Sequence, residues 1–60
     1  MSEIVKKDAI AAWKLLVAAD RENMSLQRFT QFINEQYGRN YDSLELKIYF
    51  EDLKSGKKDL

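Results

Sequence analysis

Two pairs of carboxylates are the residues of this chain best suited to acid–base chemistry: Asp42 with Glu45, and Glu51 with Asp52. Paired carboxylates can serve as general acid and general base when their surroundings separate their pKa values. The chain has no His and no Cys, so the usual base, nucleophile and soft metal ligands are missing. A helix capping box explains the first pair, and a solvated helix face explains the second. We therefore expect no enzyme activity, no cofactor and no metal site.

The net charge and the length of the chain disfavour further classes of function. The chain has 60 residues, with 10 basic and 10 acidic side chains and a net charge of zero. Nucleic-acid-binding proteins usually carry an excess of basic charge, so this class of partner is disfavoured. The apolar stretch from Ala9 to Ala19 contains Lys14 and is too short to span a bilayer. We expect a cytoplasmic protein without a membrane segment, whose partner is another protein.

Apolar residues recur at spacings of three and four along two segments, which predicts helices over about residues 3–21 and 26–37. The apolar arc of the first segment covers more than half of the helix, which indicates contact with two neighbours. Ser25 is placed to cap the start of the second helix, and Gly38 falls at its left-handed C′ position.

The next segment, SLELKIYFEDL, fits two different secondary structures. Its first apolar residues alternate with polar ones, as in a half-buried strand, while its later ones also share one side of a helix. A strand needs a partner strand, and no second segment of the chain alternates convincingly. If Asp42 is the N-cap, Glu45 completes a capping box. These signals favour a helix over about residues 43–54.

The predicted fold is therefore all-α: a compact three-helix, bundle-like single domain over residues 1–60, with a frayed tail at 55–60. Because the chain is short and has no disulfide or metal, apolar packing must supply its stability. The predicted core consists of Val5, Ala9, Trp13, Leu16, Phe29, Ile33, Tyr37, Leu46, Phe50 and Leu53.

Leu44 and Ile48 point away from the predicted core face of the third helix. Two aliphatic residues four apart on an otherwise charged arc are typical of the anchors with which a helix docks on a partner. They could instead pack against the wide apolar face of the first helix, and the sequence leaves both alternatives open. Lys7, Lys14 and Arg21 form a basic line on the first helix, which either meets an acidic partner or is simply solvated. Together these five residues are the predicted partner-binding set.

The segment from Gln31 to Ile48 resembles the helix-turn-helix of DNA-binding domains, with a helix, a turn containing Gly38 and a second helix. The resemblance implies that the second helix enters a DNA groove. The residues that would contact DNA are Arg39, Asn40, Ser43 and Lys47. The segment departs from the family pattern at Asn34, where a small residue is usual.

Three functions follow as hypotheses. The first is a small non-catalytic protein-binding module, an adaptor or an inhibitory regulator of the kind that bacteria and mobile elements encode, which acts by docking or occlusion through a helix surface. The second is a small helix-turn-helix DNA-binding regulator, acting as a dimer. The third is a structural subunit that assembles with copies of itself.

Overall fold

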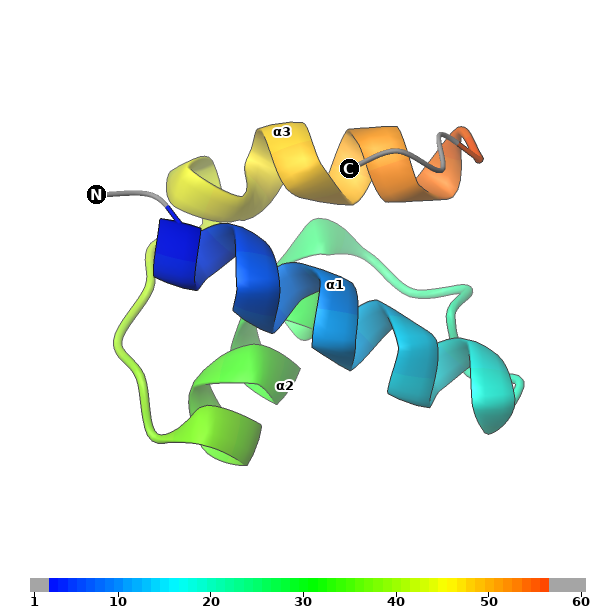
Figure 1. Cartoon of the computed structure of the whole chain (residues 1–60), viewed down its shortest axis with the longest axis horizontal. Coiled ribbons are helices and arrows are strands. Elements are labelled where there is room, and N and C mark those ends of the chain that lie inside the picture. Colours follow the sequence, from blue (N-terminus) through cyan, green and yellow to red (C-terminus); the bar gives the residue numbers. More distant parts are fainter. Residues whose placement is uncertain (1–2, 57–60) are drawn as a thin grey trace.

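The computed structural model describes residues 3–56, which form three helices: α1 (Glu3–Ala18), α2 (Leu26–Tyr37) and α3 (Ser43–Lys54). No strand occurs in this part of the chain, so the predicted all-α, three-helix fold is confirmed. Figure 1 shows α1 across the middle of the molecule, with α3 above it and α2 below it, and each helix contacts both others. The predicted tail is described only at Ser55 and Gly56, which form a turn; residues 57–60 lie outside the described residues.

The rings of Phe29 and Phe50 lie at the centre of the core, and that of Trp13 packs beside them. The ring centroids of Phe29 in α2 and Phe50 in α3 lie 4.9 Å apart. Trp13 of α1 meets both rings edge-on, at 6.0 and 6.2 Å, an arrangement that aromatic quadrupoles favour. Trp13 and Tyr37, predicted as core, are half-buried at its margin, because Trp13 lies on the flank of the apolar stripe of α1 and Tyr37 is the last residue of α2. The buried apolar residues are Val5, Ala9, Ala12, Leu16, Phe29, Ile33, Leu46, Phe50 and Leu53.

The helix α1 ends at Ala18, three residues before the predicted end. Asp20 adopts the left-handed conformation, with a φ of 59°. The N–H group of Asp20 donates to the carbonyl of Val17 at 3.0 Å, and that of Arg21 donates to the carbonyl of Leu16 at 2.7 Å. These two bonds are the Schellman pattern that closes a helix C-terminus. The apolar periodicity continues past this point, but the backbone has already turned.

The helix α2 has the predicted bounds and the predicted caps. The Ser25 hydroxyl accepts a hydrogen bond from the N–H of Arg28 at 3.3 Å. At the other end Gly38 is left-handed, with a φ of 64°, and its N–H donates to the carbonyl of Asn34. Glycine is suited to this position because it has no Cβ to clash in the left-handed conformation.

The segment Ser43–Lys54, whose sequence fits both a strand and a helix, forms a helix, as the capping signals at Asp42 and Glu45 predict. The backbone N–H of Asp42 donates to Oε1 of Glu45 at 2.9 Å, and the N–H of Glu45 donates to the Asp42 carbonyl at 3.0 Å. These bonds engage the polar groups of the first turn of α3. The apolar residues that alternate in the sequence therefore lie on two faces of the helix, one buried and one exposed.

The loop between α2 and α3 is held against the rest of the protein by side chains. The amide of Asn34 donates to the carbonyl of Tyr41 at 3.0 Å and accepts from the N–H of Tyr41 at 2.8 Å. In α1, the buried carboxylate of Asp8 accepts a bond from Nε of Arg39 at 2.9 Å and one from the Tyr41 hydroxyl at 2.7 Å. We call these three side chains the Asp8 node. They join α1 to the loop, and they explain how a carboxylate can be buried, since an unpaired one would be costly.

The Asp8 node also affects the ionisation of the tyrosine. Burial of the phenol and its hydrogen bond to Asp8 raise the pKa of Tyr41 above its ordinary value of 10.0. Both causes disfavour the phenolate, because it would lose solvation and face the negative charge of the carboxylate. Tyr41 therefore stays a hydrogen-bond donor throughout the neutral pH range.

Candidate docking surface

The outer face of α3 carries the most exposed large apolar side chains of the described residues. Leu44 is 76% exposed and Ile48 is 65% exposed, although Leu46 and Phe50 of the same helix are buried. The capped helix fixes this separation, because residues four apart share a face and the core residues occupy the other one. The alternative in which Leu44 and Ile48 pack against α1 is not what the structure shows. The two side chains form an apolar pair open to solvent.

Charged side chains surround this apolar pair. Lys47 and Glu51 follow on the same side of α3, and Glu45 lies on its other flank; all three are exposed. An apolar centre with a polar rim is the usual anatomy of a protein–protein contact. We call Leu44 and Ile48 together with this charged rim the α3 face.

The predicted basic line is broken by the end of α1. Lys7 and Lys14 are exposed on the helix, whereas Arg21 lies beyond its C-terminus in the α1–α2 connection. The five residues predicted to bind a partner therefore come from two helices and a loop. Arg21 is therefore separated from the two lysines, and it lines a surface hollow between α1 and α2 instead.

The four residues predicted to contact DNA lie in the α2–α3 loop and at the start of α3. Asn40 and Lys47 are exposed, and Ser43 is half-buried. The Nε atom of Arg39 is already bonded to Asp8, and the side chain is 41% exposed. The side of α3 that would face a groove also presents Leu44 and Ile48. Direct base contacts need polar side chains free to reach base edges, and Arg39 is committed to α1.

The carboxylates that could have done acid–base chemistry have structural positions. Asp42 and Glu45 belong to the first turn of α3, as described above, while Glu51 is exposed and Asp52 is half-buried near the end of that helix. Within residues 3–56, no three acidic side chains come close enough together to form a metal site. In the same part of the chain, no helix has the length and apolarity needed to cross a bilayer.

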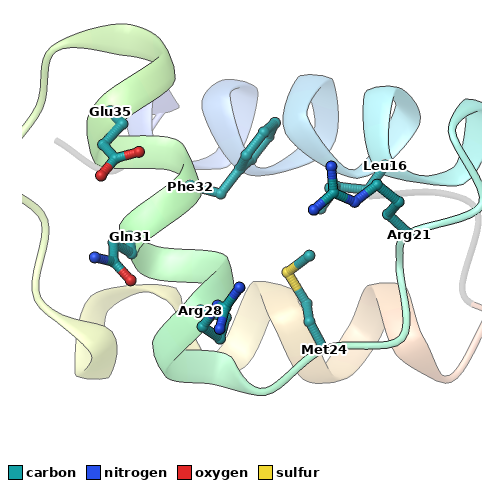
Figure 2. A pocket seen from close by; sticks show the side chains of 7 residues that line it. All are labelled: Leu16, Arg21, Met24, Arg28, Gln31, Phe32 and Glu35. Atoms are coloured by element: carbon teal, nitrogen blue, oxygen red, sulfur yellow. The ribbon is translucent and has the colours of Figure 1, made fainter.

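A surface hollow lies where α1, the α1–α2 connection and α2 meet, and sequence reasoning did not find it. Its volume is about 460 Å³, and we call it the arginine pocket. Figure 2 shows Arg21 and Met24 pointing into it from the connection, opposite the α2 side chains. It is lined by Leu16, Arg21, Met24, Arg28, Gln31, Phe32 and Glu35. The spacing of Arg28, Phe32 and Glu35 along one side of α2 was the signal available in the sequence.

In comparisons with known proteins, no protein-family model, curated protein or solved structure matches the chain.

Proposed function

We propose that this protein is a small non-catalytic protein-binding module, an adaptor or inhibitory regulator that docks the α3 face on another protein. The observation that carries the proposal is the exposure of Leu44 and Ile48 on a helix whose other apolar residues are buried. An α-helix presents such a pair to an apolar groove as anchors one turn apart. A cytoplasmic setting belongs to the same proposal, since a chain without Cys needs no oxidising compartment.

The anchors can supply a useful part of a binding energy. Complete burial of an aliphatic side chain contributes about 1.5–3 kcal/mol, and Leu44 is already about one-quarter covered and Ile48 about one-third. Burying what remains of the two contributes about 2–4 kcal/mol, which corresponds to an affinity gain of about 30- to 1,000-fold. Micromolar binding requires about 8 kcal/mol, so the partner must also contact the rim. Lys47 and Glu51 are placed for this role, and Lys7 and Lys14 offer further basic contacts on α1.

The test compares what two variants capture from the cells that make the protein. Leu44→Glu with Ile48→Glu places two charges in the proposed contact. Gln27→Glu with Gln36→Glu adds the same charge at exposed positions of α2 and is the matched control. We expect one partner protein to be captured by the wild type and by the control, and to be lost with the α3 variant. Equal capture by all three proteins would contradict the proposal.

Self-assembly is the alternative that uses the same apolar pair, with the α3 face packed on that of a second copy. Light scattering separates the two. A molar mass that rises with concentration and returns to that of the monomer in the α3 variant would replace the partner proposal by self-assembly.

The helix-turn-helix hypothesis is supported by the order of α2, loop and α3, and by exposed Asn40 and Lys47. Fluorescence anisotropy of a labelled DNA duplex at low salt tests it. Binding that weakens as salt rises, and that Asn40→Ala with Lys47→Ala reduces, would favour the regulator over the protein-binding module. We expect no such binding, because the net charge is zero and Arg39 is held by Asp8.

A further inference from the structure

Positive charge gathers at the arginine pocket from three sources. Arg21 enters from the α1–α2 connection and Arg28 from the first turn of α2. The N-terminus of α2 adds the positive end of its helix dipole. That first turn has no acidic residue, although carboxylates are favoured there. The two arginines outnumber the one acidic residue of the lining, Glu35, so an anion bound between the arginines would be stabilised.

The backbones of the two arginines take part in helix caps. The N–H of Arg21 is bonded to the carbonyl of Leu16, which closes α1, and the N–H of Arg28 is bonded to Ser25, which opens α2. Their backbones are therefore fixed while their side chains extend into the hollow, as Figure 2 shows for Arg21. Fixing the backbone in advance reduces the entropy lost when a ligand binds.

Neither guanidinium is neutralised within the described part of the chain. In residues 3–56 the only ion pair joins Asp8 and Arg39. Glu35 lines the pocket without forming an ion pair with either arginine. The nearby Glu22 does not neutralise them either, because it forms no ion pair in this part of the chain and its Oε1 atom is buried without a hydrogen-bond partner there. The arginines are therefore available for a carboxylate from outside, which a guanidinium can bind through two parallel hydrogen bonds.

The pocket also has an apolar wall. Met24 is half-buried and points into the hollow, Phe32 is half-buried on α2, and Leu16 is buried behind them. Methionine adapts its shape to varied apolar side chains, which suits a peptide site. A pocket of about 460 Å³ falls within the range of ligand sites.

We propose that the arginine pocket binds an acidic peptide segment of a partner protein, with a carboxylate on Arg21 and Arg28 and a neighbouring apolar side chain on Met24 and Phe32. A peptide fits better than a nucleic acid, because the apolar wall can bind a side chain next to the carboxylate, whereas it offers no hydrogen-bond donor to a row of phosphates. The α3 face lies on another helix, so this site goes beyond the proposed function and can fail or succeed independently of it.

The test is a titration of the isotope-labelled protein with the peptide acetyl-Asp-Leu-Asp-Leu-amide, followed by the NMR shifts of its amide groups. We expect saturable shifts around residues 21–32, with a dissociation constant of about 1 mM or below. The matched probe is acetyl-Asn-Leu-Asn-Leu-amide, which has the same shape without charge and should bind about tenfold more weakly or worse. Absence of saturable shifts at about 10 mM, or equal binding of both peptides, would overturn the proposal.

Variants separate binding from a structural role. Arg21→Gln with Arg28→Gln should weaken peptide binding about tenfold or more, whereas Lys6→Gln with Lys54→Gln, an equal charge change outside both proposed sites, should leave it unchanged. Arg28→Lys should give an intermediate loss, because the charge remains without the fork of hydrogen bonds.

Thermal stability and two further titrations complete the test. Because neither arginine forms an ion pair within residues 3–56, the Tm of the Arg21→Gln, Arg28→Gln variant should equal or exceed that of the wild type; a fall would show that the arginines are structural and would overturn the proposal. Inorganic phosphate that binds as tightly as the peptide would also overturn it. Leu44→Glu with Ile48→Glu should retain peptide binding, which makes failure of this site distinguishable from failure of the α3 face.

Discussion

Replacement of Tyr41 by Phe removes one bond of the Asp8 node and leaves the aromatic ring in place. The lost bond is 2.7 Å long, and its acceptor is the buried carboxylate of Asp8. Hydrogen bonds to charged groups contribute about 1.5–3 kcal/mol. Because Arg39 still binds the same carboxylate, we expect a loss at the lower end, about 1.5–2 kcal/mol.

That loss is large for so small a protein. At about 0.05–0.15 kcal/mol per residue, a chain of 60 residues has a free energy of unfolding of about 3–9 kcal/mol. The Tyr41→Phe variant should therefore lose a substantial part of its stability, and its Tm should fall by about 6–16 °C.

Urea unfolding followed by circular dichroism measures the effect as a lower midpoint with an unchanged slope. Tyr49→Phe is the control, because Tyr49 is a half-buried tyrosine outside the Asp8 node. A double-mutant cycle with Asp8→Asn should give a coupling energy of about 1 kcal/mol or more. A loss in Tyr41→Phe below about 0.5 kcal/mol, or one equal to that of the control, would refute the role assigned to the node.

Four further predictions follow from the same structure. Leu44→Glu with Ile48→Glu should change the free energy of unfolding by less than about 0.5 kcal/mol in urea titrations, because both side chains are exposed; a larger loss would place them in the core. Gly38→Ala should cost about 1–2 kcal/mol by the same measurement, since a φ of 64° strains any residue with a Cβ, and an unchanged midpoint would contradict this. Asp20→Gly should instead stabilise by about 0.5–1 kcal/mol, as a glycine relieves the left-handed strain at a φ of 59°, whereas a loss would mean that the Asp side chain supports the turn. The raised pKa of Tyr41 makes its contribution complete below pH 10.0 and lost as pH rises above 10.0 through the folded-state pKa, so the stability gap between wild type and Tyr41→Phe should narrow there; a constant gap would refute the shift.

The helices were predictable because their signals are local. The caps at Ser25, Gly38 and Asp42 mark the ends of α2 and α3, and both helices have the predicted bounds. The end of α1 was placed too late, because Asp20 fills a position where glycine is the usual signal. No pattern of hydrophobicity reports a left-handed aspartate.

The tertiary features were harder to predict for a physical reason. Asp8 meets Arg39 and Tyr41 across 31 and 33 residues of sequence, and no local rule pairs side chains so far apart. The helical wheel placed Leu44 and Ile48 opposite the core face correctly. Whether α1 would cover them depended on how the helices pack, which the sequence did not determine.

A photocrosslinking experiment tests docking through the α3 face most directly. The photoreactive residue p-benzoylphenylalanine would replace Leu44 in the cells that make the protein, and Gln36 on the exposed side of α2 in the control. We predict a covalent adduct with one other protein from position 44, absent from position 36 and competed away by excess wild-type protein. No adduct at position 44, or one only with a second copy of this chain, would contradict the proposed docking on another protein.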